Sequence, residues 1–266
     1  MRMANINCAR FTAIKASASR AGLASRAIIV GAMLCALCLS AQASEAPAVD
    51  HQAPLADRVN ADPAFPFSNE IAAFAKADAG DPAPSGGILF LGSSSIRLWN
   101  IGGSFPDRPV VNRGFGGATT ADVLHYYARL LPRAKPGAII VYVGENDLAG
   151  GATPADVSRN VLRLLKRLRE DYPKARIAYL SLKPSPIRWT LWPRLAAVNM
   201  TVAARSRAVG FDYLDVGTSL LARDGLPDAS LFRPDGLHMN ARGYGRWTRL
   251  VDGWLHWGKG AAPSPS

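Results

Sequence analysis

Cysteine is scarce in this sequence, and its positions decide what the protein can contain. The three cysteines all lie within residues 1–43: Cys8, Cys35 and Cys38. That segment has five basic residues and no acidic one, and an apolar run over 27–39 leads to a small-x-small ending at 40–43. A basic start, a short apolar centre and such an ending predict a secretory signal peptide that is cleaved after Ala43.

Cleavage after Ala43 would leave a chain without cysteine. Disulfides, thiolate catalysis and cysteine-ligated metals are therefore excluded together in the mature protein. We expect a periplasmic or secreted protein whose core stabilises the fold unaided. An uncleaved membrane anchor is the alternative, but the apolar run is shorter than the roughly 20 residues of a membrane span. We therefore expect no stable membrane insertion after cleavage.

A concentrated positive charge is also missing once this segment is removed. The formal charge of +11 falls to +6 without its five basic residues. The remaining lysines and arginines are dispersed and are not interleaved with aromatic residues, which indicates a solvated surface rather than a nucleic-acid partner. His-Glu-x-x-His and clustered metal-ligand patterns are absent, so we expect no metal and no cofactor. The Gly-x-Ser-x-Gly elbow of the α/β-hydrolases is absent too, which disfavours that fold.

Short apolar runs alternate with amphipathic segments along most of the chain. With 48% hydrophobic and 19% charged residues, the composition suits one domain with a sizeable core. Repeated strand–helix units of this length predict a single three-layer α/β/α domain with a central parallel sheet. The expected strands are 88–91, 109–112, 138–143, 177–182 and 212–216, and the expected helices are 69–77, 120–131, 154–168, 193–208 and 241–257.

Composition also divides the chain into four regions. The signal peptide of 1–43 is followed by a loosely ordered lead-in over 44–79, which is rich at first in Ala, Pro and Asp and carries one short helix. The α/β domain is expected over 80–258. Residues 259–266 are expected to form a flexible tail.

Four polar clusters follow predicted strands or precede the last helix. They are residues 93–95, 112–117, 144–147 and 235–238. Ligands of a parallel sheet bind at the carboxyl ends of its strands, so all four are expected to meet at one edge. Each cluster alone has an ordinary explanation, such as a helix cap, a glycine turn or a surface histidine. Their joint occurrence predicts a catalytic site.

In order and rough spacing, these clusters resemble the sequence blocks of the SGNH (GDSL-like) hydrolases. The four matching blocks are Phe90-Leu-Gly-Ser-Ser-Ser-Ile96, Asn112-Arg-Gly-Phe-Gly-Gly117, Gly144-Glu-Asn-Asp147 and Asp235-Gly-Leu-His238. The resemblance covers about 88–252. It implies the family's flavodoxin-like α/β fold and makes 80–258 an SGNH hydrolase domain.

The resemblance also implies roles for individual residues. The catalytic triad would be Ser94, Asp235 and His238, and the oxyanion hole would be formed by Ser94, Gly117 and Asn146. The chain departs from the family at Ser93, where an acid is usual. Because that acid lies outside the triad, the chemistry should survive its loss. The choice of Ser94 among three adjacent serines rests on the alignment alone.

The chemistry of these residues agrees with such roles. A serine hydroxyl becomes a good nucleophile only when a neighbouring base removes its proton. His238 is the only credible base, because the other histidines after residue 43 lie in the lead-in, on an expected helix and near the chain end. Asp235, three residues away, can fix the imidazole tautomer. Gly117 has no Cβ and would let the backbone approach the reacting group closely.

The residues that bind the substrate are harder to assign. Five side chains fall on or near the expected edge loops and are candidates: Arg97, Trp99, Arg113, Trp189 and Trp192. The alternative for the tryptophans is an ordinary place in the core or at an interface.

The function expected from the sequence is that of an exported serine esterase or acylhydrolase that cleaves small O-acyl esters. An O-acyltransferase acting on envelope carbohydrate would use the same acyl-enzyme and pass the acyl group to a sugar hydroxyl. A non-catalytic glycan-binding module would keep the fold and lose the reaction. A complete set of serine, glycine, asparagine, aspartate and histidine favours chemistry over binding alone.

Overall fold

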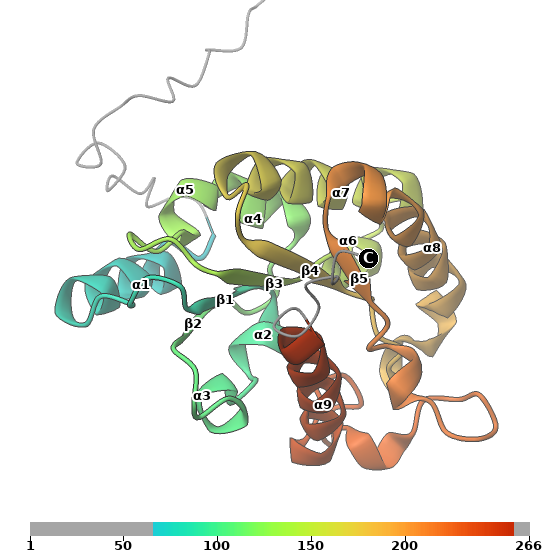
Figure 1. Ribbon diagram of the computed structural model, residues 1–266. Helices are drawn as coiled ribbons and strands as arrows, with labels where there is room; N and C mark the ends of the chain where they lie inside the picture. The colour runs from blue at the N-terminus through green and yellow to red at the C-terminus, as the bar shows by residue number, and fades with distance from the viewer. Residues whose placement is uncertain (1–65, 258–266) are drawn as a thin grey trace, which may run out of the picture. The chain divides into compact units, whose positions relative to one another are not determined.

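A five-stranded parallel sheet organises the computed structural model, which describes residues 66–257 (Figure 1). The strands lie in the order β2-β1-β3-β4-β5, and every neighbouring pair is parallel. Their bounds are β1 Ile88–Gly92, β2 Val110–Gly114, β3 Ala138–Tyr142, β4 Arg176–Leu180 and β5 Asp212–Leu214. The prediction of an α/β fold with a central parallel sheet is confirmed.

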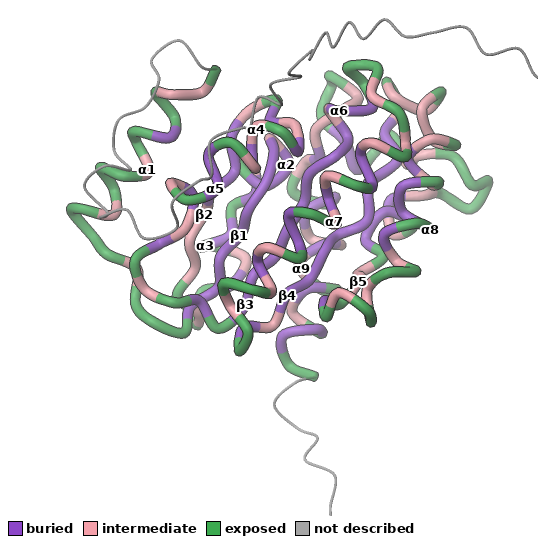
Figure 2. The backbone as a smooth tube through the Cα atoms, turned by 90° about the horizontal axis from the view of Figure 1, so that it is seen from above, coloured by how far each residue is buried: buried purple, intermediate pink, exposed green. Residues whose placement is uncertain are grey.

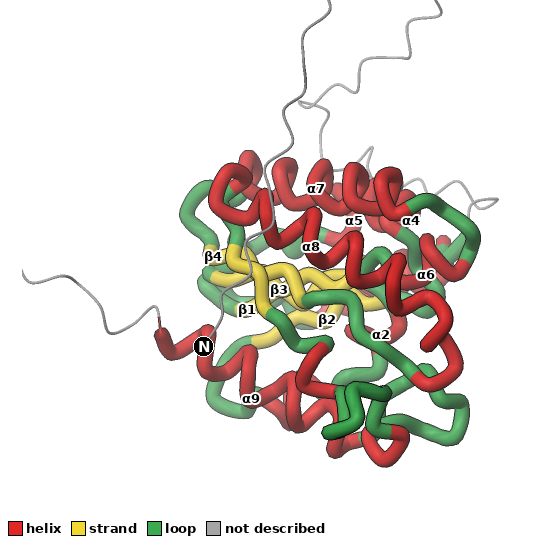
Figure 3. Tube along the Cα trace, turned by 90° about the vertical axis from the view of Figure 1, so that its right-hand side faces the viewer, coloured by secondary structure: helices red, strands yellow, loops and turns green. Residues whose placement is uncertain are grey.

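Helices cover both faces of the sheet. Figure 3 shows α7 and α8 on one side of the strands and α9 on the other. The helices are α1 Ser68–Gly80, α2 Ser94–Arg97, α3 Ile101–Ser104, α4 Thr120–His125, α5 Tyr127–Leu130, α6 Glu145–Ala149, α7 Pro154–Asp171, α8 Trp192–Val209 and α9 Ala241–Trp257, with the 3₁₀ helices η2 Pro186–Leu191, η3 Thr218–Leu220 and η4 Ala229–Leu231. None of these helices is long and apolar enough to cross a membrane.

The sheet forms where the apolar runs are continuous. All residues of β1 and β3 are buried, as expected for strands covered on both faces. Figure 2 shows this burial following the strands through the middle of the described residues. Helix starts agree with the sequence as well. Thr119 caps α4 in a capping box with Asp122, and Pro154 occupies the first turn of α7.

The short helices are the main departure from the expected elements. The helix expected over 120–131 is divided into α4 and α5 at Tyr126. Helices α2, α3 and α6 were not predicted, because four or five residues are too few to show a helical period. The helix expected from Asn69 begins at Ser68 instead, after Phe67 in the left-handed region.

The expected signal peptide, most of the lead-in and the tail of 259–266 lie outside the described residues, and the region boundaries stay predictions. The helix of the lead-in is α1, which packs on the rest of the fold. Ile71 is fully buried, and the Phe67 ring makes an edge contact with Phe115 at a centroid distance of 5.2 Å.

Gly92 is the tightest point of the sheet. It ends β1 with a φ of +147°, and a Cβ there would lie 1.9 Å from the carbonyl oxygen of Tyr142. We expect Gly92→Ala to lower the free energy of unfolding by about 3–5 kcal/mol, because backbone strain and steric overlap add. Gly102→Ala is the control, since no atom lies within 4 Å of its Cβ position. Urea denaturation should separate the two variants, and equal midpoints would contradict the prediction.

Candidate active site

Ser94 stands directly after the carboxyl end of β1, as the first residue of α2. The ends of three strands are level here, because Gly92 pairs with Gly114 of β2 and with Tyr142 of β3. The Ser93 N–H donates to the Tyr142 carbonyl at 3.1 Å, which fixes the start of α2 against β3. As the first helical residue, Ser94 has a backbone N–H without an intrahelical acceptor.

His238 and Asp235 reach Ser94 from a turn before α9. His238 Nε2 lies 3.0 Å from Ser94 Oγ, and His238 Nδ1 lies 2.7 Å from Asp235 Oδ2. The other carboxylate oxygen of Asp235 accepts the backbone N–H groups of Leu237 and His238, each at 2.9 Å. Gly236 takes a φ of +63° inside this turn. The structure thus brings together the three residues that the sequence singled out for a triad.

Asp235 is ionised across the neutral pH range. The hydrogen bond from His238 is the largest effect and lowers the pKa of Asp235 to about 2, against a smaller opposing effect of burial and with help from the two backbone N–H groups. A carboxylate can only accept hydrogen bonds, so Nδ1 of His238 carries the proton. In the neutral imidazole Nε2 is then the acceptor, and the Ser94 hydroxyl donates to it.

The end of β2, which leads into the glycine loop of residues 114–117, is tied to the segment that carries Ser94. Asn112 Nδ2 donates to the Ile96 carbonyl at 2.9 Å, and Asn112 Oδ1 accepts the Gly114 N–H at 2.8 Å. Gly117 follows with a φ of +78°, and no atom lies within 4 Å of its Cβ position. The glycine at this position is therefore required by the backbone conformation, and not by a close approach of another group in this structure.

Asn146 lies on α6, beside the same loop. Its Nδ2 donates to the carbonyl of Ala118, the residue after Gly117, at 3.0 Å, and its Oδ1 accepts from Arg188 Nη1 at 3.1 Å. An amide nitrogen carries two hydrogens, so one remains after the bond to Ala118. The segments that carry the residues predicted for the oxyanion hole thus contact one another.

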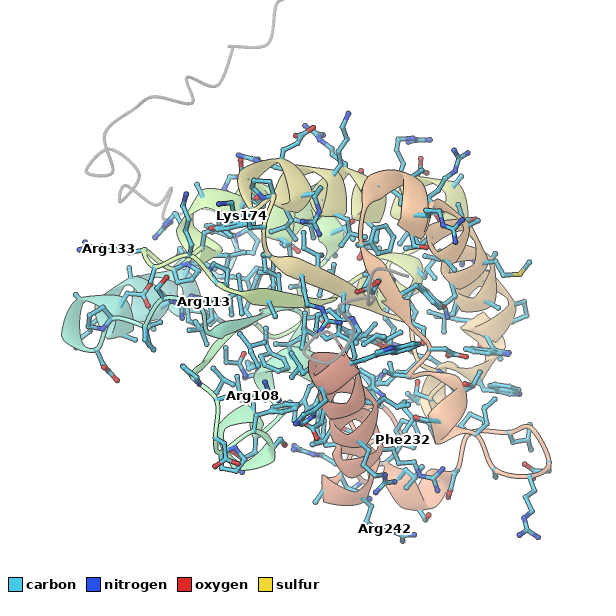
Figure 4. All side chains as sticks on the ribbon, viewed as in Figure 1. Arg108, Arg113, Arg133, Lys174, Phe232 and Arg242 are labelled. Carbon is cyan, nitrogen blue, oxygen red and sulfur yellow. The ribbon has the colours of Figure 1, made fainter. Side chains whose placement is uncertain are left out.

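Two of the five substrate-binding candidates are wrong. Trp99 is 2% exposed and packs in the core, because Tyr244 and Trp247 of α9 lie against its ring. Arg113 is 4% exposed, forms an ion pair with Asp78 of α1 and lies over the Phe74 ring. Figure 4 labels Arg113 beside α1. Both side chains are buried in structural contacts and are not available to bind a substrate.

The other three candidates stay near the edge. Arg97 is exposed, and its guanidinium lies against Gly116 of the glycine loop. Trp189 and Trp192 are half-buried and stack on each other, with centroids 5.8 Å apart and planes 15° apart. They flank the turn between η2 and α8. A role in substrate binding stays a prediction for these three.

A buried ionic cluster next to Asn146 was not predicted. Glu145 accepts from Lys183 Nζ at 2.8 Å, from the Tyr142 hydroxyl at 2.5 Å and from Arg188 at 3.1 Å. Burial alone would raise the pKa of Glu145, but the neighbouring cations and hydrogen bonds outweigh it and hold that pKa below its usual value. In the sequence, Lys183 precedes a proline at the end of an expected strand and Glu145 lies inside a motif, and neither pattern indicates that the two side chains are in contact.

Removal of the Glu145 charge should destabilise the fold. We expect Glu145→Gln to lower the free energy of unfolding by about 3 kcal/mol at neutral pH, because it leaves Lys183 buried without an anion. Glu170→Gln is the control, since Glu170 pairs with Lys166 on the exposed face of α7, and such pairs contribute about 0–1 kcal/mol. Equal losses in urea denaturation would contradict the prediction.

The pH dependence of stability gives a second test of the Glu145 charge. The pKa of Glu145 is lower in the folded protein than in the unfolded chain. Its carboxylate therefore contributes stability that is present above the unfolded value of about 4.3 and is lost as the pH falls through the folded value. The stability difference between the wild type and Glu145→Gln should shrink on acidification in that range.

Comparison with known proteins relates the chain to a described family and to solved structures. A model of the GDSL-like Lipase/Acylhydrolase family matches residues 97–246. No curated protein matches the chain. A Streptococcus pneumonia protein named for platelet activating factor is 20% identical, with 71% of this chain and 92% of that chain covered and a TM-score of 0.64.

Two further structures share the fold. A GDSL-like lipase from Bacteroides thetaiotaomicron is 16% identical, with coverage of 71% of this chain and 98% of that chain and a TM-score of 0.60. The psychrotrophic esterase EstA from Pseudoalteromonas is 18% identical, with coverage of 63% and 97% and a TM-score of 0.51. Sequence identities this low carry the likeness of fold alone.

Proposed function

Because the chain belongs to the GDSL-like lipase/acylhydrolase family, we propose that it is an exported serine esterase that cleaves small O-acyl esters. The observation that carries the proposal is the 3.0 Å contact between Ser94 Oγ and His238 Nε2, with Asp235 on the far side of the imidazole. This is the arrangement of nucleophile, base and orienting acid that acyl transfer requires.

The reaction proceeds in two halves. Ser94 Oγ attacks the ester carbonyl carbon while its proton passes to His238 Nε2, and the resulting imidazolium is stabilised by Asp235. The bond between the carbonyl carbon and the alcohol oxygen then breaks, and the alcohol leaves with the proton from Nε2. In the second half, water attacks the acyl-enzyme and gives a proton to Nε2. The bond between the carbonyl carbon and Ser94 Oγ then breaks, Oγ takes that proton back from Nε2, and the carboxylic acid is released.

Negative charge on the carbonyl oxygen needs donors that are already in place. The backbone N–H groups of Ser94 and Gly117 and the remaining hydrogen of Asn146 Nδ2 would supply them. Losing one such donor typically costs about 3 kcal/mol of transition-state stabilisation, or a factor of about 10²–10³ in rate.

Exposure of the site favours water as the acceptor of the acyl group. The side chain of Asp235 is 46% exposed and that of His238 is 23% exposed. Bulk water therefore reaches the base that must activate it, and this supports hydrolysis rather than transfer to a sugar hydroxyl.

A chromogenic acetyl ester tests the proposal directly. The purified protein should hydrolyse it and should react covalently with a serine-directed fluorophosphonate. If the protein shows no turnover and no labelling, the esterase is rejected and a glycan-binding module is supported. A series of esters from acetyl to long-chain acyl groups, with carbohydrate and lipid alcohols, would then define the substrate. Arg97, Trp189 and Trp192 are proposed to contact it.

Export is the second part of the proposal and rests on residues 1–43. Expression of the full chain, followed by cell fractionation and N-terminal sequencing, should recover the protein outside the cytoplasm with Ser44 as its first residue. Recovery from the cytoplasm with an intact N-terminus would reject this part and leave the esterase untouched.

A further inference from the structure

Arg188 connects the buried ionic cluster to Asn146. It lies in η2, and one of its nitrogens, Nη1, is 3.1 Å from Glu145 Oε1 and 3.1 Å from Asn146 Oδ1. Nη1 carries two hydrogens, so it can serve both acceptors at once. The other oxygen of Glu145 is held by Lys183 at 2.8 Å, which keeps Glu145 in place for Arg188.

These contacts fix which end of the Asn146 amide faces which neighbour. A guanidinium can only donate hydrogen bonds, so the atom facing Arg188 must be Oδ1. The backbone carbonyl of Ala118 can only accept, so the atom facing it at 3.0 Å must be Nδ2. A flipped amide would set donor against donor and acceptor against acceptor. The NH₂ group of Asn146 therefore lies on the side of the glycine loop, with one hydrogen donated to the Ala118 carbonyl and one remaining.

We infer that Arg188 is a positioning residue, which holds the Asn146 amide with its NH₂ group toward the carbonyl oxygen of the reacting ester. The inference rests on the proposed esterase function, because it gives Arg188 a purpose only if Asn146 binds an oxyanion. Arg188 acts through Asn146 and need not touch the substrate.

Placement of Arg188 in the fold suits such a role. Its side chain is 21% exposed, so it is largely enclosed but lies at the edge of the site. The next residue back, Ile187, donates its N–H to the Gly236 carbonyl at 3.1 Å, inside the turn that carries Asp235 and His238. The segment η2 therefore contacts both the turn of the base and the amide of the oxyanion hole.

A double-mutant cycle tests the inference. Arg188→Gln replaces a donor-only group with one that can donate or accept, so it should lower kcat by about tenfold and leave KM within about twofold. Asn146→Ala should lower kcat by about 10²–10³. The double variant should be no slower than Asn146→Ala alone, because Arg188 then has no amide to orient. If the kcat of the double variant is lowered by the product of the two single-variant losses, the inference is overturned.

Two further variants separate orientation from folding and charge. Arg188→Lys keeps a donor-only cation and should lose less activity than Arg188→Gln. Arg159→Gln removes the same charge from an exposed pair with Asp156 and should leave kcat unchanged. Equal effects of the lysine and glutamine variants, or a rise in KM confined to anionic esters, would overturn the inference in favour of a structural or substrate-binding role.

One measurement does not depend on activity. The side-chain NH₂ signals of Asn146 can be identified in ¹⁵N spectra by their loss in Asn146→Ala. They should shift and lose protection from solvent exchange in Arg188→Gln and remain unchanged in Arg159→Gln. Unchanged signals in Arg188→Gln would overturn the inference even if the wild type hydrolyses no ester, an outcome that would reject the proposed function separately.

Discussion

Ser94→Ala is expected to lower kcat for ester hydrolysis by about 10⁴-fold or more and to abolish fluorophosphonate labelling. The physical reason is that, within residues 66–257, the hydroxyl of Ser94 is the one that lies against His238, at 3.0 Å from Nε2. Without it no acyl-enzyme can form, and the remaining oxyanion donors can assist only a direct attack by water. Steady-state kinetics and mass spectrometry of the labelled protein measure both effects.

The neighbouring serines are matched controls for this variant. Ser93 and Ser95 are both buried, with 3% exposure each, and Ser93 makes no side-chain cap to α2. Ser93→Ala and Ser95→Ala should therefore keep the label. A label that persists in Ser94→Ala, or is lost in one of the neighbours instead, would show that the nucleophile has been assigned to the wrong serine.

Asp235→Asn is expected to lower kcat by about 10⁴-fold while the fold remains intact. An amide at this position can present its NH₂ group to Nδ1, which favours the imidazole tautomer whose Nε2 carries the proton and cannot accept from Ser94. His238→Ala should lose at least as much activity, because it removes the base itself. Asp224→Asn, at an exposed turn, is the control and should retain full activity.

The pH dependence of the wild type adds a second check on this pair. Since the pKa of Asp235 is about 2, this carboxylate stays ionised over the range in which a histidine takes up a proton. The acid limb of the activity profile should therefore contain no protonation of Asp235 above about pH 4. Two protonations on the acid limb above pH 4 would contradict the assignment of Asp235.

The fold and the positions of the site were predictable because both depend on local sequence. Continuous apolar runs marked the strands, and the carboxyl ends of those strands marked the segments that carry Ser94 and Asn146. The choice of Ser94 among three serines, and the roles of Asn146 and His238, came from the resemblance to the SGNH hydrolases. The contacts of Trp99 and Arg113 could not be predicted in this way. Trp99 lies against Trp247, and Arg113 pairs with Asp78. No local sequence pattern indicates contacts between residues so far apart in the chain.

The ionic cluster around Glu145 could not be predicted either, because its members are distant in the sequence. Glu145 belongs to a recognised motif, but its meaning depends on Lys183 and Arg188, about 40 residues later in the sequence. A buried lysine becomes reasonable only when its carboxylate partner is known, because an unpaired charge in the core is strongly unfavourable. Spatial pairing of charges is set by the completed fold.

The two residues proposed as the acid and the base share one short turn, and this has a consequence for control of the proposed activity. Asp235 and His238 would travel together if the turn moved, with their mutual hydrogen bonds preserved. Ser94 belongs to a separate element and would not follow. Displacement of the turn by a few ångströms would thus break the hydrogen bond between Ser94 and His238 and inactivate the nucleophile, while the Asp235–His238 hydrogen bonds remain. Return of the turn would restore the Ser94 contact.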